Sequence, residues 1–397
     1  MTSRAKPFGI RTMNKISAQG LSLFGSDYQI SDANDAPDAI LVRSAQVDTD
    51  LFPTALAVAR AGAGVNNITI DKASEKGVCV FNTPGANANA VAELVFDAMG
   101  AAARNIIAGN AWIKSLEGMT DDKEISAAVE KGKGQFAGVE LRGRTLGVIG
   151  LGKIGVLVAN GGVARGMSVI AYEPYPSIGN MHALHPAVRI TSNLEEVMRT
   201  ADAVSMHVPL TPNTKNLINA DMIAAMRDGA ILCNFSRGGI VDEAATVAAL
   251  DAGKLRAYVT DFASQTTLKC PKCINFPHLG ASTAEAEENC ATMAVEQLKL
   301  YLEHGVVRNS VNFPAIAAMP AAGTKTRLVI VNRDVPNMIA AVTKILGDAG
   351  VNIQSFKNES NGKIGYNLVD LACEIDDGLV KSIEAAGDVL KVRVIKY

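Results

Sequence analysis

The 397-residue sequence is poor in aromatic residues, in cysteine and in net charge, and it contains no long apolar run. Phe, Trp and Tyr make up 5% of it, whereas glycine occurs 35 times, a mixture that suits buried parallel strands with tight strand-to-helix turns. A formal charge of −2 gives no electrostatic reason to expect nucleic acid or a membrane surface as partner. Without a run of about eighteen apolar residues or a signal-peptide core at the N-terminus, we expect a cytoplasmic protein.

Six cysteines are too few for a disulfide framework in a chain of this length. Cys270 and Cys273 form a lone Cys-x-x-Cys that lacks a second pair. Zinc binding or redox chemistry at these two residues therefore competes with a simpler interpretation, a chance spacing before a buried strand. We expect no metal site.

The pattern of apolar residues changes twice along the chain. Up to about residue 92 short apolar runs alternate with helical patterns, followed by an apolar helix over 93–110 and a surface helix and loop over 120–134. From Arg142 strands and helices alternate again, which predicts a parallel, doubly wound sheet. After a linker near 309–323, the last seventy or so residues follow the order βαββαβ of a ferredoxin-like domain.

The motif Gly150-Leu-Gly-Lys-Ile-Gly155 follows a predicted strand and opens a predicted helix, the context in which Gly-x-Gly-x-x-Gly binds a dinucleotide. Its glycines permit the turn, the close approach of backbone to pyrophosphate, and close packing of helix on strand. Glu173 ends the next strand, 18 residues after Gly155. A carboxylate there accepts hydrogen bonds from ribose hydroxyls and repels a 2′-phosphate, so NAD is favoured over NADP.

Two further segments carry candidate catalytic residues. Arg237 lies in Asn-Phe-Ser-Arg-Gly-Gly-Ile-Val-Asp-Glu at a predicted strand end, where its guanidinium is suited to grip a carboxylate; a surface arginine paired with a nearby acid is the simpler alternative. His278 lies in Pro-His-Leu-Gly-Ala-Ser-Thr, and histidine suits a proton that leaves a hydroxyl as hydride leaves its carbon. The remaining histidines are interpreted as surface residues (His182, His185, His304) or as packing near the nucleotide (His207).

Together, these three motifs resemble the D-isomer-specific 2-hydroxyacid dehydrogenase family. Supporting segments are Val42-Arg43-Ser44, Arg60-Ala-Gly-Ala-Gly-Val65 and Asn82-Thr-Pro-Gly85, so that the resemblance covers residues 10 to about 314. It implies a Rossmann-type NAD-binding domain over 93–282 and a discontinuous, flavodoxin-like α/β substrate domain over 1–92 and 283–313. A linker over 314–324 and a small domain over 325–397 follow.

The resemblance also implies roles for individual residues. Arg237 would hold the substrate carboxylate with help from the backbone of Ala63, Gly64 and Val65, and His278 would act as acid and base. Arg43 and Arg60 are the candidates for a substrate phosphate, and a homo-oligomer paired through the NAD domain is expected. The expected cofactor contacts are Gly150, Gly152, Lys153, Ile154, Gly155, Glu173, His207, Val208, Phe235, Ser236, Asp261, Gly280 and Ala281, with Asp261 on the nicotinamide amide.

One departure from the family matters for mechanism. Members normally carry a catalytic glutamate shortly after the strand that ends at the position of Asp261, whereas here no acid lies between Asp261 and His278. The histidine thereby lacks the neighbour that would orient its ring and stabilise its charged form. Another acid, weaker activity or a shifted pH optimum remain open at this point.

The C-terminal domain resembles an ACT domain, the small regulatory module of amino-acid enzymes. Asn352 matches the asparagine of the effector site in serine-inhibited relatives, while Asn332 and Asp334 replace its other residues. Serine inhibition is one hypothesis, and a dimerisation module is the other, because exposed sheet edges readily pair.

Three functions stay open. The preferred one is NAD-dependent turnover of a small phosphorylated 2-hydroxy acid. A second is turnover of an unphosphorylated acid such as glyoxylate or hydroxypyruvate. The third is a non-catalytic NAD-binding regulator, which the missing glutamate favours and which Arg237 and His278 argue against.

Overall fold

The computed structural model describes residues 6–397, and it divides into two compact units. One unit comprises residues up to 87 together with 284–397, and the other comprises residues 88–283. The first five residues of the predicted 1–92 segment lie outside the described part. Within residues 6–397, no helix has both the length and the apolarity needed to span a bilayer.

The unit of residues 88–283 is built on a parallel sheet of seven strands in the order β12-β11-β10-β9-β6-β7-β8. The order reverses beside β6, which places a topological switch point between β6 and β9, the position where such sheets bind ligands. The strands are β6 (Thr145–Ile149), β7 (Ser168–Tyr172), β8 (Arg189–Thr191), β9 (Ala203–Met206), β10 (Ala230–Asn234), β11 (Leu255–Thr260) and β12 (Cys273–Asn275).

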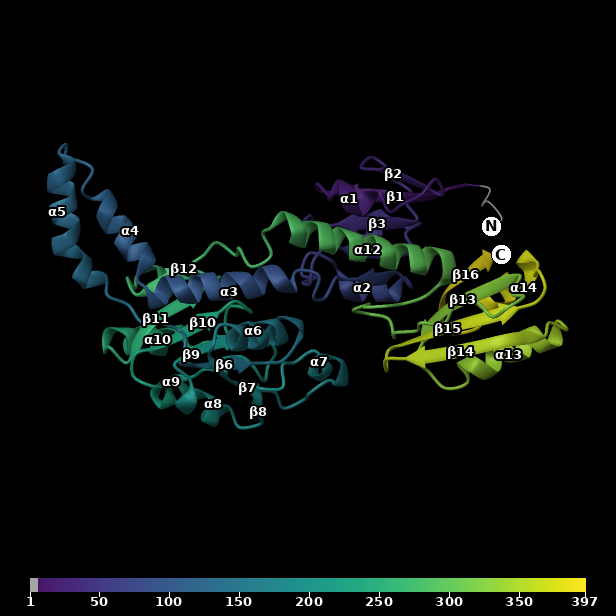
Figure 1. The fold of residues 1–397 in the computed structure, drawn as a ribbon. Coiled ribbons are helices and arrows are strands. Elements are labelled where there is room, and N and C mark those ends of the chain that lie inside the picture. The colour runs from purple at the N-terminus through teal and green to yellow at the C-terminus, as the bar shows by residue number, and fades with distance from the viewer. Residues whose placement is uncertain (1–5) are drawn as a thin grey trace. The chain divides into compact units, whose positions relative to one another are not determined.

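Helices cover both faces of this sheet, as a doubly wound fold requires (Figure 1). One face packs against α3 (Ala88–Ala103) and α6 (Lys153–Ala164). The other packs against α8 (Leu194–Thr200), α9 (Ala220–Ala225) and α10 (Glu243–Asp251), while α7 (Ile178–His182) and α11 (Gln265–Leu268) are short connecting helices. The predicted Rossmann-type sheet is confirmed.

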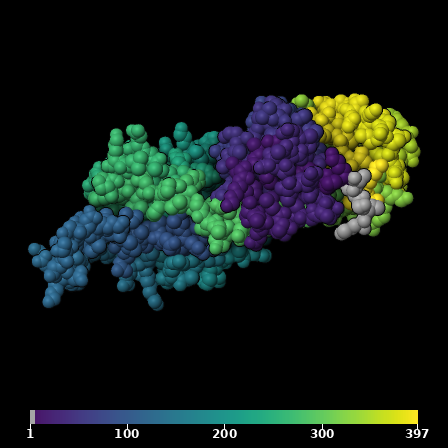
Figure 2. All heavy atoms as spheres, turned by 90° about the horizontal axis from the view of Figure 1, so that it is seen from above, coloured from purple at the N-terminus to yellow at the C-terminus, as the bar shows by residue number. Residues whose placement is uncertain are grey.

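The predicted single helix over 93–110 is wrong. The chain leaves α3 at Ala103, Asn105 adopts a left-handed conformation (φ 53°), and α4 (Ile106–Lys114) begins in a new direction. Asparagine tolerates this conformation better than other residues with a side chain, and apolar composition alone does not reveal the break. With α5 (Asp122–Gly132) and the 3₁₀ turn η2 (Lys133–Phe136), α4 forms an arm that projects from its unit, blue in Figures 1 and 2.

The other unit contains a five-stranded parallel sheet in the order β2-β1-β3-β4-β5, the flavodoxin-like order. Helix α12 (Ala284–His304) packs on one face and α2 (Ile70–Glu75) with the 3₁₀ turn η1 (Thr49–Leu51) on the other. The remaining elements are β1 (Phe8–Met13), α1 (Ala18–Leu21), β2 (Tyr28–Ser31), β3 (Ala39–Val42), β4 (Ala57–Arg60) and β5 (Cys79–Phe81).

The last elements of the chain form the predicted βαββαβ arrangement, an antiparallel sheet in the order β14-β15-β13-β16. Leu328 and Ile330 pack under its two helices, whereas Val329 and Tyr366 on the opposite face share a core with Tyr301 of α12. The elements are β13 (Thr326–Arg333), α13 (Met338–Asp348), β14 (Ile353–Ser360), β15 (Ile364–Leu371), α14 (Asp377–Glu384) and β16 (Val389–Lys396).

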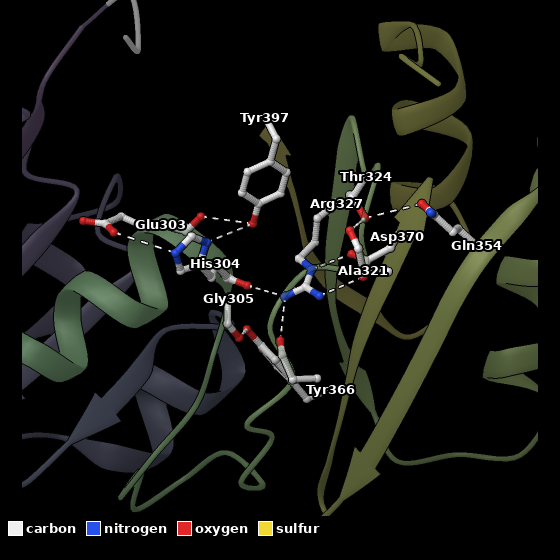
Figure 3. A network of polar contacts seen from close by, with 11 residues as sticks. Glu303, His304, Gly305, Ala321, Thr324, Arg327, Gln354, Tyr366, Asp370 and Tyr397 are labelled. Carbon is white, nitrogen blue, oxygen red and sulfur yellow. Dashed lines mark hydrogen bonds and ion pairs between the residues drawn. The ribbon is translucent and has the colours of Figure 1, made fainter. Parts of the chain in front are cut away.

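Side chains of this C-terminal sheet cap the end of α12 (Figure 3). The last carbonyls of a helix lack intrahelical partners and carry the negative end of its dipole, so a cation or a hydroxyl group stabilises them. Arg393 donates to the Tyr301 carbonyl at 2.5 Å, Tyr397 to the Glu303 carbonyl at 3.2 Å and Arg327 to the His304 carbonyl at 2.9 Å. Just past the helix, the Tyr366 hydroxyl donates to the Gly305 carbonyl at 2.7 Å.

His304, interpreted from sequence as a surface residue, is half-buried. Its ring stacks on Tyr397 at a centroid separation of 5.8 Å, and its Nδ1 lies 3.2 Å from the Tyr397 hydroxyl. The position at a helix end resembles a surface site in sequence, because the residue that covers it, Tyr397, is 93 positions away along the chain.

Candidate cofactor and active site

The glycine loop after β6 has the geometry that a dinucleotide needs. Gly150 adopts a φ of +91°, and a Cβ at Gly155 would lie 1.9 Å from the Gly150 carbonyl oxygen, so neither position tolerates a side chain. Gly152 begins α6 as its N-cap without a side-chain cap, and open space surrounds the position of its missing Cβ. The positive end of α6 is thus left uncapped and open at Gly152, which fits a pyrophosphate.

Glu173 lies directly beside this loop. One carboxylate oxygen accepts the backbone N–H of Leu151 at 2.7 Å, and the other accepts that of Tyr175 at 2.9 Å. These bonds fix a negative charge next to the turn at the end of β7. An acid held at this point is suited to accept ribose hydroxyls and to repel a 2′-phosphate.

His207 follows β9 on the opposite side of the switch point. Its backbone N–H donates to Ile149 at 2.7 Å, and its Nε2 lies 2.9 Å from the Ser205 hydroxyl, whereas Nδ1 is buried without a partner. Burial lowers the pKa of His207 to about 3, so the ring is neutral at physiological pH. The residue therefore contributes shape rather than charge beside Gly150.

Arg237 follows β10 and is exposed, with its Nη1 donating to the Ser236 carbonyl at 2.7 Å. Asn234 fixes the backbone of this turn with two hydrogen bonds. Its side-chain NH₂ donates to the Arg237 carbonyl at 2.9 Å, and its side-chain oxygen accepts the Ser236 N–H at 3.1 Å. The guanidinium has no acidic partner among residues 6–397. The simpler alternative, an arginine paired with Asp242 or Glu243, is not what the structure contains: Asp242 caps α10, and Glu243 accepts the Ser264 hydroxyl.

His278 is exposed and holds a left-handed backbone conformation (φ 55°) in the turn after β12. Asp261, only 3% exposed at the end of β11, accepts the backbone N–H groups of the two residues after His278. These are Leu279 at 2.8 Å and Gly280 at 2.7 Å. A Cβ on Gly280 would approach the Asp261 carboxylate to 3.1 Å. In this structure Asp261 holds the turn that presents His278, a contact that the sequence did not reveal.

An aromatic ring lies against His278 in this chain, which lacks the glutamate that family members normally carry after the strand of Asp261. The Phe262 ring meets the imidazole edge-on, with centroids 5.0 Å apart. Glu243, at the start of α10, accepts the hydroxyl of Ser264, the N-cap residue of α11. Within residues 6–397, no acidic side chain makes an ion pair or a hydrogen bond with His278.

The other predicted cofactor residues lie at the same edge of the sheet, because each follows a strand or begins α6. The Ser236 hydroxyl donates to the Met206 carbonyl at 2.6 Å, and Phe235 is buried against Phe276. Lys153 is exposed, whereas Ile154, Val208 and Ala281 are partly buried.

The predicted substrate residues lie in the other unit: Arg43 follows β3, Arg60 ends β4, and Ala63, Gly64 and Val65 form the loop after β4. Arg60 donates to the Gly64 carbonyl at 2.5 Å, and Asn82 donates to the Ala63 carbonyl at 2.6 Å. Val65 belongs to the same loop, which these two side chains hold in place. Asn82 belongs to the Asn-Thr-Pro-Gly segment that supports the family resemblance, but only the fold reveals its hydrogen bond to Ala63.

Arg43 follows β3, and its guanidinium pairs with Glu287 of α12 at 2.5 Å. Sequence reasoning missed Glu287. The acid-rich start of α12 was the only signal, and it did not distinguish Glu287 from Glu285.

Cys270 and Cys273 are both buried and lie in one turn, with the Cys273 N–H donating to the Cys270 carbonyl at 3.0 Å. Burial raises the pKa of Cys273 to about 12 and so keeps the thiol protonated at neutral pH. No cluster of three or more candidate metal ligands occurs in residues 6–397.

The predicted effector residues differ in their surroundings. Asn332 is 3% exposed and accepts the Asn367 amide at 2.7 Å, Asp334 accepts the Ser360 hydroxyl, and Asn352 is exposed. In the described residues, no hydrogen bond joins any two of Asn332, Asp334 and Asn352.

Comparison with known proteins gives consistent matches. A family model described as the D-isomer specific 2-hydroxyacid dehydrogenase, NAD binding domain, matches residues 96–280. The chain is 38% identical over 282 residues to a hydroxypyruvate reductase of Thermotoga maritima, a match that covers 68% of this chain and 85% of the relative. Among solved structures, the TT0316 protein of Thermus thermophilus is similar with a TM-score of 0.63 at 27% identity, covering 76% of this chain and 99% of the other.

The chain is also 39% identical over 289 residues to a D-3-phosphoglycerate dehydrogenase of Methanocaldococcus jannaschii. That match covers 70% of this chain and 52% of the relative. The chain therefore spans about half the length of the curated phosphoglycerate dehydrogenase that it matches.

Proposed function

This chain belongs to the D-isomer-specific 2-hydroxyacid dehydrogenase family, and on that premise we propose that it is an NAD-dependent enzyme that oxidises D-3-phosphoglycerate to 3-phosphohydroxypyruvate, a reaction of serine biosynthesis. One observation carries the proposal. The glycine loop, Arg237, Asp261 and His278 each follow a strand of one parallel sheet, β6, β10, β11 and β12, and so leave it at its carboxyl edge.

The residues around the switch point fit a dinucleotide. The open N-terminus of α6 at Gly152 would hold the pyrophosphate, and Glu173 would accept the ribose hydroxyls. Bound NAD would supply the hydride acceptor. The protein's own contribution is to place the substrate carbon beside it.

Arg237 and His278 divide the remaining chemistry. The guanidinium of Arg237, free of any acidic partner in the described residues, would bind the substrate carboxylate through two parallel hydrogen bonds. A ring nitrogen of His278 would take the proton from the 2-hydroxyl group during oxidation and return it during reduction. With Phe262 against the ring instead of an acid, His278 would perform this transfer without a carboxylate partner.

Two alternatives remain distinguishable. The match to a hydroxypyruvate reductase favours an unphosphorylated substrate, and the absent acid beside His278 favours a non-catalytic NAD-binding regulator. An absorbance assay of NADH with 3-phosphohydroxypyruvate, hydroxypyruvate and glyoxylate separates them. Turnover of the phosphorylated acid at least ~tenfold more efficient supports the proposal, an equal difference the other way supports the reductase, and NADH binding without turnover supports the regulator.

We further propose that the C-terminal domain binds a small amino acid, serine being the first to test. The turn after β13, with Asp334, and the exposed Asn352 provide the polar groups. Serine at millimolar concentration should lower turnover in the same assay, and Asn352→Ala should weaken that effect. If serine changes neither turnover nor thermal stability, the domain has only a structural role.

The arm of α4 and α5 is proposed as the surface that joins two copies of this chain. Ile106, Ile107, Ile113 and Met119 are large apolar side chains that stand exposed on it, and the family resemblance leads us to expect pairing through this domain. Sedimentation should show an oligomer in which Ile107→Glu/Ile113→Glu weakens association. A monomeric wild-type protein would contradict this.

A further inference from the structure

Two basic residues leave adjacent strands at the carboxyl edge of the five-stranded sheet. Arg60 ends β4 and lies opposite Val42 of β3 in the parallel register, and Arg43 is the next residue along the chain. Arg60 donates from Nε to the Arg43 carbonyl at 2.9 Å and from Nη1 to the Gly64 carbonyl at 2.5 Å. Because these bonds turn its guanidinium into the backbone, Arg60 builds the loop, and Arg43 is the arginine that is left to meet an anion.

Arg43 already binds an anionic group, the carboxylate of Glu287. Its Nη1 lies 2.5 Å from Oε1 of Glu287, and the two side chains are 37% and 44% exposed. Glu287 lies in the first turn of α12, where the positive end of the helix dipole stabilises a negative charge. The pair is therefore solvent-accessible and weak, so an incoming anion is able to displace Glu287.

We propose that Glu287 is a specificity-determining residue that competes with a substrate phosphate for Arg43 and lowers the affinity for phosphorylated relative to unphosphorylated hydroxy acids. A phosphate group carries a charge of about −1.5 to −2 near neutral pH, and it gains the guanidinium only when the carboxylate moves away. The displaced carboxylate, still tethered to α12, then repels the phosphate. An unphosphorylated acid has no phosphate to bind Arg43, so Glu287 does not change the affinity for it. The inference rests on the proposed function.

The test uses Glu287→Gln in the full-length protein, which keeps the shape of the side chain and removes its charge. Glu285→Gln is the matched control, since Glu285 lies in the same first turn, is exposed, and makes no ion pair with Arg43. With NADH saturating, the KM for 3-phosphohydroxypyruvate should fall at least about threefold in Glu287→Gln, while kcat and the KM for hydroxypyruvate stay constant. The difference should shrink at about 0.5 M KCl, because salt screens exposed charges.

Equal changes in KM for both substrates, or an equal effect of Glu285→Gln, would overturn the proposal. In an Arg43→Met background the effect of Glu287→Gln should vanish, because the two residues then no longer share a partner. Binding of inorganic phosphate, followed by calorimetry, measures the Arg43 site without turnover. If no hydroxy acid is turned over, the proposed function fails, yet tighter phosphate binding by Glu287→Gln than by Glu285→Gln still supports the role of Glu287, and equal binding refutes it.

Discussion

Asp261 binds the backbone of Gly280: its Oδ2 accepts the Gly280 N–H at 2.7 Å while its Oδ1 accepts the neighbouring N–H of Leu279. Both oxygens of a buried carboxylate are thereby committed to one turn. That turn begins with His278 in a left-handed conformation, which costs free energy in a residue with a side chain. The carboxylate compensates for this cost and sets the direction of the imidazole.

Asp261→Asn should disturb this turn, because an amide offers one acceptor oxygen and points its NH₂ group at the second backbone N–H. We expect turnover to fall roughly 10- to 100-fold, because a small misplacement of a reacting group costs about that much. Steady-state kinetics measure the change, and Asp251→Asn, on the exposed end of α10, is the control. Unchanged turnover would show that the turn holds without Asp261.

Replacing His278 with glutamine should lower turnover by roughly 10²–10⁴, because a positioned acid or base contributes about that much. Binding of NADH, followed by fluorescence, should stay within about twofold of wild type, since the cofactor loop lies elsewhere. His182→Gln, on the exposed end of α7, serves as control. Full activity of His278→Gln would assign the proton transfer to another group.

Glu173 should decide between the two nicotinamide cofactors. Replacing it with serine removes the charge that repels a 2′-phosphate, so the ratio of kcat/KM for NAD to that for NADP should fall about tenfold or more. The same change frees the N–H groups of Leu151 and Tyr175, so the KM for NAD should also rise. A ratio unchanged from wild type would place the ribose site elsewhere.

Arg327 and Asp370 form a buried bidentate pair, 1% and 2% exposed, that connects β13 and β15 and caps α12. Removing one partner leaves a buried charge alone, so Arg327→Met should lower the free energy of unfolding by about 3–5 kcal/mol. Arg327→Met/Asp370→Leu should recover much of that loss. Urea unfolding compares the variants, and Arg199→Met, part of an exposed pair on α8, should cost at most about 1 kcal/mol.

Burial of His207 should make stability depend on pH. Its pKa is lowered from 6.5 to about 3, so below pH 6.5 the unfolded chain binds a proton that the folded chain does not. Above pH 6.5 the ring is neutral in both states and the burial of His207 does not lower stability. As the pH falls from 6.5 towards 3, the free energy of unfolding decreases by up to about 1.4 kcal/mol per pH unit. Urea midpoints at pH 7.5 and pH 5.5 should therefore differ less in His207→Gln than in wild type.

The sequence by itself determined the two parallel sheets, the C-terminal βαββαβ domain and the glycine loop. Each rests on a local pattern: buried apolar runs such as Ala39–Val42, helical periods between them, and glycines at positions such as Gly150 where a side chain cannot fit. Local patterns failed where one residue altered the direction of the chain, as at Asn105, whose left-handed conformation separates α3 from α4.

Only the tertiary structure decided which groups meet. Glu287 pairs with a residue 244 positions earlier in the chain, Asp261 holds a turn beyond β12, and Tyr397 covers the end of α12. Charge, hydrogen bonding and stacking act over a few ångströms in space, whereas a sequence records distance only along the chain. Strand order and helix packing decide which residues that are distant along the chain become neighbours in space. They arise from burial of the whole core rather than from any single motif.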